Sequence, residues 1–357
     1  MAFASVSGYG NLPNGNFSSV IYSKKVQLAF RKKTVASAIS NSDYFGEIAS
    51  QGDTVRIIKE PEISVSAYAR GTTIAAQDLD DADFSLVVDK ANYFAFKIDD
   101  IEDAHSHVNF MQLATDRAAY RLADQYDQEV LGYVSGYKQS ALHAAADTVN
   151  TTTNGVKANA SAGTDELLAA NKLTKASFGN ITTSGAANHS IPVAARLPGA
   201  TALPTAYVSP AMIVSRMARL MDAANVDTSG RWLVIDPVMM EVLRDEDSRF
   251  LNADFGDSGA LRNGLVLSNF HGFRVYVSNN LPADGTGAGT TGTANQNTDY
   301  GVIVSGHDSA FATAEQINKT ETYRDPDSFA DIVRGMHLYG RKILRPEAIV
   351  VAKYNLA

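Results

Sequence analysis

The sequence predicts an α+β fold in which one long helix separates a region of strands from a mixed lobe. Three observations predict it. Between residues 53 and 98, apolar residues alternate with polar ones, as in β-strands that have one face buried and the other exposed to solvent. From Ile101 to Val134, apolar residues recur every three or four positions with one skipped turn, as in an amphipathic helix. Beyond residue 164, helical and strand patterns follow each other in mixed order.

Composition excludes several classes of protein. The chain has 357 residues, of which 45% are hydrophobic and 20% charged, so it can bury a sizeable core. It has no cysteine, which excludes disulfides and thiolate metal sites. We expect no secretory signal and no membrane helix, because no run of about 18 apolar residues occurs. The net charge of −8 argues against a dedicated nucleic-acid reader.

Charge is distributed unevenly along the chain. Residues 1–42 contain no acid and carry a basic cluster: Lys24, Lys25, Arg31, Lys32 and Lys33. Residues 78–103 carry nine acids against two lysines, and Asp80, Asp81 and Asp83 are among them. Two interpretations stay open: solvated surface charge, or a basic arm that docks on an acidic element of a neighbouring subunit. Five positive charges would bind DNA phosphates only weakly and in a salt-dependent way.

The N-terminal third reads as an arm followed by a long excursion. Residues 1–22 are rich in Gly, Ser and Asn, which is typical of an extended arm, and a short amphipathic piece follows from Ser23 to about Ser40. The excursion has alternating apolar positions at Val55 and Ile57, at Ile63, Val65 and Ala67, and at Phe94, Phe96 and Ile98. Turn chemistry at residues 70–72 and 80–82 makes the excursion hairpin-like.

The helix that follows is predicted to act as a beam. Residues 101–134 would give roughly nine turns and a length of about 50 Å. The acids from Asp99 to Asp103 would lie at its start, where the helix dipole favours negative charge, and Gly132 and Gly136 would mark its end.

The second half is predicted as a mixed lobe and a long two-stranded return. Residues 144–163 read as a linker, and residues 245–263 and 282–298 as loops. The predicted helices are Thr164 to Phe178, Pro210 to Ala224 and Pro237 to Arg244. The predicted strands are residues 231–236, 264–267, 273–277, 300–305, 312–323 and 331–344, the last two joined by a turn at Arg324 to Asp327.

Motifs that carry chemistry are missing from the sequence. There is no HExxH frame, no GxSxG elbow and no phosphate-binding glycine loop. The acids at residues 99–103 could suggest paired carboxylates, but a helix start explains them more simply. We therefore expect no enzyme activity, no catalytic residue, no cofactor and no metal.

The order of arm, excursion, long helix, lobe and two-stranded return resembles the major capsid proteins of tailed phages, the Hong Kong 97-type fold. The resemblance covers nearly the whole chain. Local segments carry it: Gln51 to Ile57, Tyr68 to Ile74, Lys97 to Ile101, Ala224 to Pro237, Gly272 to Pro282 and Arg345 to Ala348. Residues 144–205 look longer than a compact member needs, so an insertion is possible there. The Lys–Asn crosslink of some members is not carried over, because no motif here identifies the pair.

The resemblance implies a division of the chain and a set of partners. The implied parts are an N-terminal arm (1–46), an E-loop (47–98), a peripheral domain with the spine helix (99–140), an axial domain (141–311) and the closing peripheral strands (312–357). It implies hexamers and pentamers in an icosahedral virion shell around double-stranded DNA, assembled in the host cytoplasm with scaffolding and portal proteins. DNA would be touched weakly at most, and no membrane is involved.

We expect the inter-subunit contacts in three regions: the arm, the excursion, and the turn from Arg324 to Phe329. The residues are Lys24, Lys25, Arg31, Lys32, Lys33, Arg70, Asp80, Asp81, Asp83, Arg324, Asp325 and Asp327.

Three alternatives stay open. An encapsulin-like, non-viral shell would have the same architecture. A soluble α/β ligand-binding protein or hydrolase would use the loops at 245–263 and 282–298. A tail or fibre protein is disfavoured by the long helix and by the lack of β-repeats.

Overall fold

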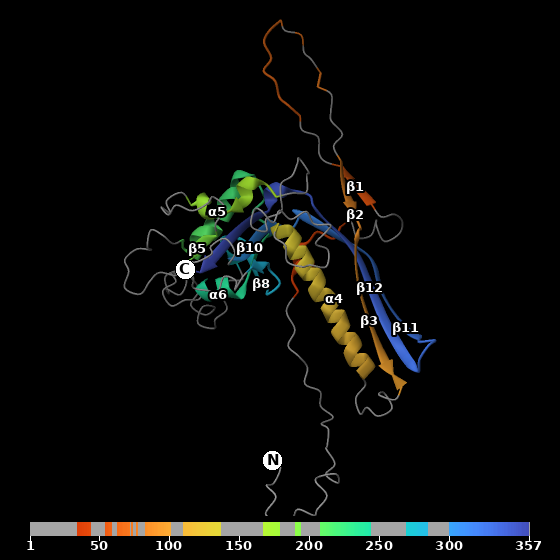
Figure 1. Cartoon of the computed structure of the whole chain (residues 1–357). Coiled ribbons are helices and arrows are strands. Elements are labelled where there is room, and N and C mark those ends of the chain that lie inside the picture. Colours follow the sequence, from red (N-terminus) through yellow and green to blue (C-terminus); the bar gives the residue numbers. More distant parts are fainter. Residues whose placement is uncertain are drawn as a thin grey trace, which may run out of the picture.

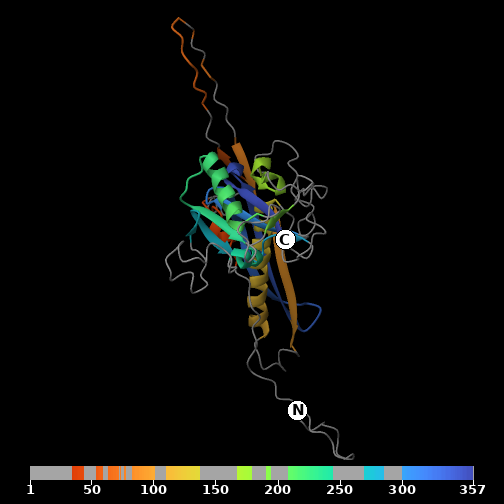
Figure 2. The ribbon, with the colours of Figure 1, turned by 90° about the vertical axis from the view of Figure 1, so that its left-hand side faces the viewer.

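The computed structural model describes residues 34–43, 54–58, 63–71, 73, 76–77, 83–100, 110–136, 167–178, 190–193, 208–243, 269–284 and 300–356. It shows a mixed lobe, a long three-stranded sheet with helix α4 beside it, and a thin excursion (Figure 1). In both views residues 63–71 project away from the other described parts of the chain (Figures 1 and 2). No described helix is both long enough and apolar enough to cross a membrane.

The excursion runs from β1 (Thr54–Ile58) to β2 (Asp83–Val87), which pair antiparallel from Thr54↔Val87 to Ile58↔Asp83. This confirms the predicted hairpin. Residues 63–71 form no strand, so the strand expected at Ile63 to Ala67 is wrong. All of these residues are exposed, and no described layer covers their apolar positions. The turn at Arg70 is confirmed, and Gly71 takes the positive φ of 92° that glycine permits.

The long sheet has the strand order β11-β12-β3. Strands β11 (Phe311–Arg324) and β12 (Ala330–Ile343) form the predicted two-stranded return, with a register shift between Glu315 and Ile317. Strand β3 (Lys90–Asp99) pairs antiparallel with β12 along its whole length. The inward side chains of β12 are buried towards α4, and the alternate ones face outwards.

Helix α4 (Phe110–Ser135) is the predicted beam, about 39 Å long for its 26 residues. Residues 101–109 lie outside the described part of the chain. Asp99 ends strand β3 and Asp100, directly after it, is helical, whereas Glu102 and Asp103 of the acids expected at the helix start lie among the residues that are not described. Gly132 lies inside the helix, and only Gly136, with a φ of 73°, marks its end. The Glu129 carboxylate of α4 makes a buried ion pair of 3.2 Å with Arg341 of β12, which holds the helix on the sheet.

The lobe is built on an eight-stranded sheet with the path β4-β13-β10-β6-β8-β7, to which β5 and β9 add at β13 and β10. The strands are β4 (Lys172–Leu173), β5 (Ile191–Val193), β6 (Arg231–Ile235), β7 (Asn269–Phe270), β8 (Phe273–Val277), β9 (Ala283–Asp284), β10 (Tyr300–His307) and β13 (Val350–Leu356). Two predicted helices are confirmed, α5 (Pro210–Ala223) with Pro210 in its first turn and α6 (Pro237–Leu243).

Both faces of this sheet are covered. Leu233 and Ile235 of β6 pack with α5 and α6, whereas Trp232 and Val234 pack with α4 and with α1 (Ala36–Ile39). Central strands buried on both faces lack the alternating pattern and read as apolar runs, which β6 does. Helix α4 therefore contacts the lobe on one side and the long sheet on the other.

One further expectation, the helix from Thr164 to Phe178, is corrected. In place of a helix up to Phe178, the described residues form a 3-10 turn η2 (Ala169–Asn171), strand β4 and a second turn η3 (Lys175–Ser177). Strand β4 pairs in parallel with β13, and this pairing overrides local helix preference. Strand β13 follows a 3-10 turn η6 (Pro346–Ala348) and pairs with β10. Residues 350–356 therefore lie in the lobe sheet.

Several expectations fall outside the described residues. They are the arm up to residue 33, the linker at 144–163, the loop at 245–263, the strand at 264–267 and residues 285–298 of the second loop. Of the amphipathic piece expected from Ser23, the described part holds only the short helix α1.

Candidate inter-subunit surfaces

The tip of the excursion, residues 63–71, presents apolar side chains to solvent. Val65 is 97% exposed, and Ile63 and Tyr68 are about two-thirds exposed. Fully burying an aliphatic or aromatic side chain stabilises by about 1.5–3 kcal/mol, which the isolated subunit does not gain here. Clustered exposed apolar residues mark interaction sites, so the tip is a candidate contact surface. Arg70, a predicted contact residue, lies exposed on this tip.

The base of the excursion, in contrast, is fixed to the body. Leu86 of β2 and Val88 are buried against Ala312 and Ala314 of β11. At Gly340 of β12, an added Cβ would lie 2.4 Å from the carbonyl oxygen of Val87, so the two backbones cross in close contact. A fixed base and an uncovered tip suit a segment that reaches beyond its own subunit.

The turn between β11 and β12 is held by charged side chains in the last residues of β3 and directly after it. Arg324 makes a two-pronged contact with the Asp100 carboxylate, with one N–O distance of 3.0 Å. Lys97 of β3 donates to Asp325 at 2.7 Å and also to Ser328. These bonds from Lys97 and Ser328 lower the pKa of Asp325 to about 2. Arg324 and Asp325 are therefore engaged within the chain, and they fix the shape of the turn.

Asp327 stands in the same turn, and its backbone N–H donates to the Asp325 carboxylate at 3.1 Å. The most exposed large side chain of the turn is Phe329, at 79%. Sequence reasoning concentrated on the charges and did not single out Phe329. An apolar residue that follows Pro, Asp and Ser in a tight turn was the available signal.

The outer face of the long sheet, away from α4, carries a second apolar pair. Tyr93 of β3 and Met336 of β12 are register partners, and both are exposed. Next to them, Arg334 pairs with Glu321 at 2.9 Å and lies over the Tyr323 ring at 4.9 Å from its centre. Tyr93 lies within the excursion that was predicted to make contacts, but Met336 and Arg334 of β12 were not predicted, because sequence periodicity alone does not say which face a helix covers.

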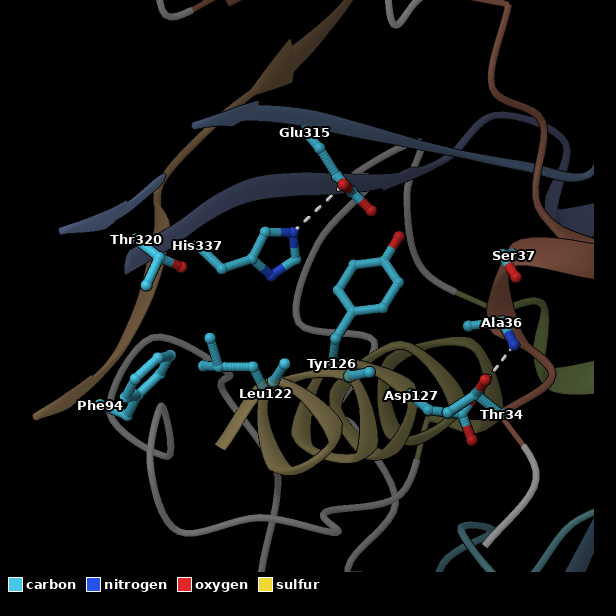
Figure 3. A pocket seen from close by; sticks show the side chains of 12 residues that line it. Thr34, Ala36, Ser37, Phe94, Leu122, Tyr126, Asp127, Glu315, Thr320 and His337 are labelled. Atoms are coloured by element: carbon cyan, nitrogen blue, oxygen red, sulfur yellow. Dashed lines mark hydrogen bonds and ion pairs between the residues drawn. The ribbon is translucent and has the colours of Figure 1, made fainter. Parts of the chain in front are cut away.

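A cavity of about 250 Å³ lies between α1, α4 and the long sheet (Figure 3). In it, His337 of β12 pairs with Glu315 of β11 at 3.3 Å, and the Tyr126 ring stands edge-on to the imidazole. Burial raises the pKa of the Tyr126 phenol from its ordinary 10 to about 12. The cavity therefore lies at the packing interface between helix α4 and the long sheet.

The remaining predicted contact residues fall mostly outside the described part of the chain. This holds for Lys24, Lys25, Arg31, Lys32 and Lys33, and for Asp80 and Asp81. Asp83 begins β2, where its backbone pairs with Ile58. Among the described residues, no group of three or more His, Asp or Glu side chains is placed to hold a metal ion.

Comparison with known proteins relates the chain to phage capsid proteins. The family model described as phage capsid protein matches residues 59–352. No curated protein sequence matches the chain. A solved structure from Mycobacterium phage Che8 is similar at 25% identity and a TM-score of 0.69, over 95% of this chain and 98% of the other.

Two more distant structures share the fold. The capsid of cyanophage P-SCSP1u is 20% identical with a TM-score of 0.64, over 96% of this chain and 94% of that one. The capsid of Ralstonia phage GP4 is 11% identical with a TM-score of 0.60, over 99% and 98%.

Proposed function

The chain belongs to the phage capsid protein family, and from this premise we propose how its surfaces build a shell. It is a major capsid protein with a Hong Kong 97-type α+β fold, and its place is the icosahedral shell of the virion. We propose that copies associate as hexamers and pentamers around double-stranded DNA, and that the chain catalyses no reaction.

One observation carries the proposal: the excursion tip at residues 63–71 is apolar, exposed and mounted on a buried base. Ordering such a segment costs conformational entropy, about 1–2 kcal/mol per residue for the backbone. Within the described chain, little contact offsets this cost. A neighbouring subunit that covers Ile63, Val65 and Tyr68 would offset it, and the same contact repeated in every copy would add up through avidity.

The turn is proposed as a second contact. In this view Arg324, Asp325 and Asp327 act mainly by holding the turn in shape, and Phe329 is the group that a neighbour covers. The ion pairs of Asp325 with Lys97 of β3 and of Arg324 with Asp100, the residue after β3, support this division of roles. Exposed charges that are already paired gain little from a further partner, whereas a buried phenyl ring gains more.

The arm is proposed as a third contact. Its acid-free sequence and the five cations from Lys24 to Lys33 fit an acidic partner such as Asp80, Asp81 and Asp83 of a neighbour. Weak, salt-dependent contact of the same cations with packaged DNA is compatible with this role.

We also propose a division into domains. The arm comprises residues 1–46, the E-loop 47–98 and the spine-helix part of the peripheral domain 99–140. The axial domain comprises 141–311, with an insertion within 144–205, and it is joined by the last strand. The peripheral domain closes with the β11–β12 hairpin. The pairing of β13 with β10 supports placing residues 350–356 with the axial domain.

Assembly is proposed to take place in the host cytoplasm with scaffolding and portal proteins as partners. Expression of the full chain, alone and with the candidate scaffold, followed by sedimentation and electron microscopy, tests the proposal. We expect rings of five or six subunits, closed shells or tubular polyheads. A monodisperse monomer in both preparations would contradict it, and co-purification of an enzyme inside closed shells would favour a cargo compartment instead.

A further inference from the structure

One buried carboxylate, that of Asp127 on α4, joins three segments that are far apart in the sequence. Its Oδ1 accepts the backbone N–H groups of Val35 and Ala36, both at 2.7 Å. Its Oδ2 accepts the side-chain amide of Asn280, which follows β8, at 2.8 Å. Asp127 itself is completely buried. Figure 3 shows the carboxylate of α4 directed at the start of α1.

The segment held by Asp127 directly follows residues 1–33, the part of the predicted arm that lies outside the described residues. Val35, Ala36 and Ile39 are about 1% exposed, so this stretch is packed into the core. Its far end is fixed as well, because Asn41 exchanges backbone hydrogen bonds with Phe311 and Thr313 at 3.1 Å. Residues before Thr34 therefore start from a point whose position and direction are set at Val35 and Ala36.

The use of a carboxylate at this point is costly. Removing a carboxylate from water is unfavourable, and burial raises the pKa of Asp127 above its ordinary value. A second buried carboxylate, that of Asp124, accepts the same Asn280 amide at 2.9 Å, which adds like-charge repulsion. A neutral Ser or Thr could accept a helix N–H without this cost. What the carboxylate adds is three strong hydrogen bonds that fix α1, α4 and the lobe in one arrangement.

We propose that Asp127 is a positioning residue for assembly: it fixes where and in which direction residues 1–33 leave the subunit. This inference rests on the proposed function, since the direction of the arm matters only if the arm reaches a neighbour. It adds to that function a defined anchor, located inside the subunit and remote from the contacts themselves.

Hydrogen exchange on the unassembled full-length chain tests the anchor directly. In Asp127→Ala, we expect the amides of Val35 and Ala36 to exchange at least tenfold faster, while those of Ile303 and Val304 in β10 stay protected. Asp127→Asn, which keeps an acceptor oxygen but loses the charge, should give a smaller increase and serves if the alanine variant does not fold. Unchanged exchange at Val35 and Ala36 in the variant that folds would overturn the anchor.

Asp124→Ala is the matched control. Asp124 lies one turn earlier on α4, is equally buried and shares Asn280, but the bonds to Val35 and Ala36 come from Asp127. We expect this variant to leave the two amides as protected as in the unmodified chain. An equal increase in both alanine variants would mean general loosening of the cluster and would overturn a specific role for Asp127.

Trypsin gives an independent measure, because the arm carries its own cleavage sites. Cutting after Lys33 requires residues 34–36 to leave the anchor and enter the protease cleft, whereas cutting after Lys24 does not. We expect the ratio of cleavage after Lys33 to cleavage after Lys24 to rise several-fold in Asp127→Ala and to stay constant in Asp124→Ala. A constant ratio in both would overturn the anchor.

The assembly step is scored by counting regular closed shells in electron micrographs. We expect several-fold fewer from Asp127→Ala than from Asp124→Ala at equal amounts of folded protein, and equal numbers would overturn the positioning role. If the unmodified chain forms no shells under any condition, the proposed function fails and the positioning role with it. The exchange and trypsin results then still decide whether Asp127 anchors residues 35 and 36.

Discussion

At the residue scale, the Asp325 carboxylate shows how a charge can organise a surface without facing a partner. It accepts bonds from Lys97 and Ser328, and it also accepts the N–H of Asp327. Sequence reasoning identified the turn from its composition, because Asp, Pro and Ser carry local information. It could not find Lys97, because that residue comes from a strand 228 positions earlier in the chain.

The lowered pKa of Asp325 predicts an acid-labile turn. Because its folded pKa of about 2 lies below the ordinary 3.8, its stabilising contribution is present above pH 3.8 and is lost as the pH falls through about 2. Asp325→Asn should show the loosened turn already at pH 7, measured as faster hydrogen exchange of the Asp327 amide. Asp331→Asn, which changes a neighbouring charge without removing the acceptor, is the control. Equal protection of the Asp327 amide in both variants would refute this role for Asp325.

Asp236 is the opposite case, because its pKa is raised in the folded chain, whereas that of Asp325 is lowered. Burial raises its pKa, although it accepts hydrogen bonds from the Tyr354 hydroxyl and from the N–H of Met239. The folded chain therefore holds the proton to a higher pH than the unfolded chain, and stability is lost as the pH rises from 3.8 through the folded pKa. The melting temperature of the unmodified subunit minus that of the Asp236→Asn variant should therefore decrease as the pH rises through this range. A difference that grows with rising pH would contradict the prediction.

At the scale of elements, sequence periodicity was sufficient to predict helices and strands that have one face buried and the other exposed to solvent. It located α5, α6 and the long strands β3, β11 and β12. It failed for β4 and β5, because strands of two or three residues are defined by their pairing with β13 and not by their own composition. Periodicity also led to the wrong prediction of a strand at residues 63–67. Apolar and polar residues alternate there, but no other described part of the chain packs against the apolar ones.

The second half of α4 shows another limit of the sequence pattern. Three acidic side chains are buried there, although acids normally indicate the solvent-exposed face of a helix: Asp124, Asp127 and Glu129. Their partners are Asn280 and Arg341, which lie more than 150 residues later in the chain. The anchor at Asp127 was invisible in the sequence for this reason.

The crossing of β2 over β12 predicts a stability effect at Gly340. An added Cβ would meet the backbone of Val87, which cannot move aside by changing rotamer. Gly340→Ala should therefore destabilise the subunit by roughly 1–3 kcal/mol, measured by urea unfolding. Gly335→Ala is the matched control in the same strand, because its Cβ would meet the Phe94 ring, a side chain that can shift. A larger loss in the control than in Gly340→Ala would be evidence against a tight crossing.

At the scale of the whole molecule, function resides in parts that the subunit leaves uncovered. The order of arm, excursion, beam and lobe could be read from the sequence, because each has its own composition or period. Which side chains remain exposed could not, because exposure depends on packing between distant segments. Phe329 and the Tyr93–Met336 pair became visible only in the folded chain.

The exposed tip predicts a variant that folds but does not assemble. Val65→Asp places a charge where the neighbour would bury an apolar side chain, so shell yield should fall at least tenfold. The melting temperature of the subunit should stay unchanged, because Val65 is almost fully exposed. Ser66→Asp adds the same charge at the next position without removing an apolar group and should assemble better. Unimpaired assembly of Val65→Asp would show that this side chain is not a contact.

The central claim is that the excursion tip is a contact between copies of this chain in a closed shell. A cryo-electron microscopy reconstruction of particles assembled from the full chain tests it most directly. It should show residues 63–71 lying on a neighbouring subunit, with Val65 and Tyr68 covered. A closed shell in which these residues extend into solvent and touch no neighbour would contradict the account.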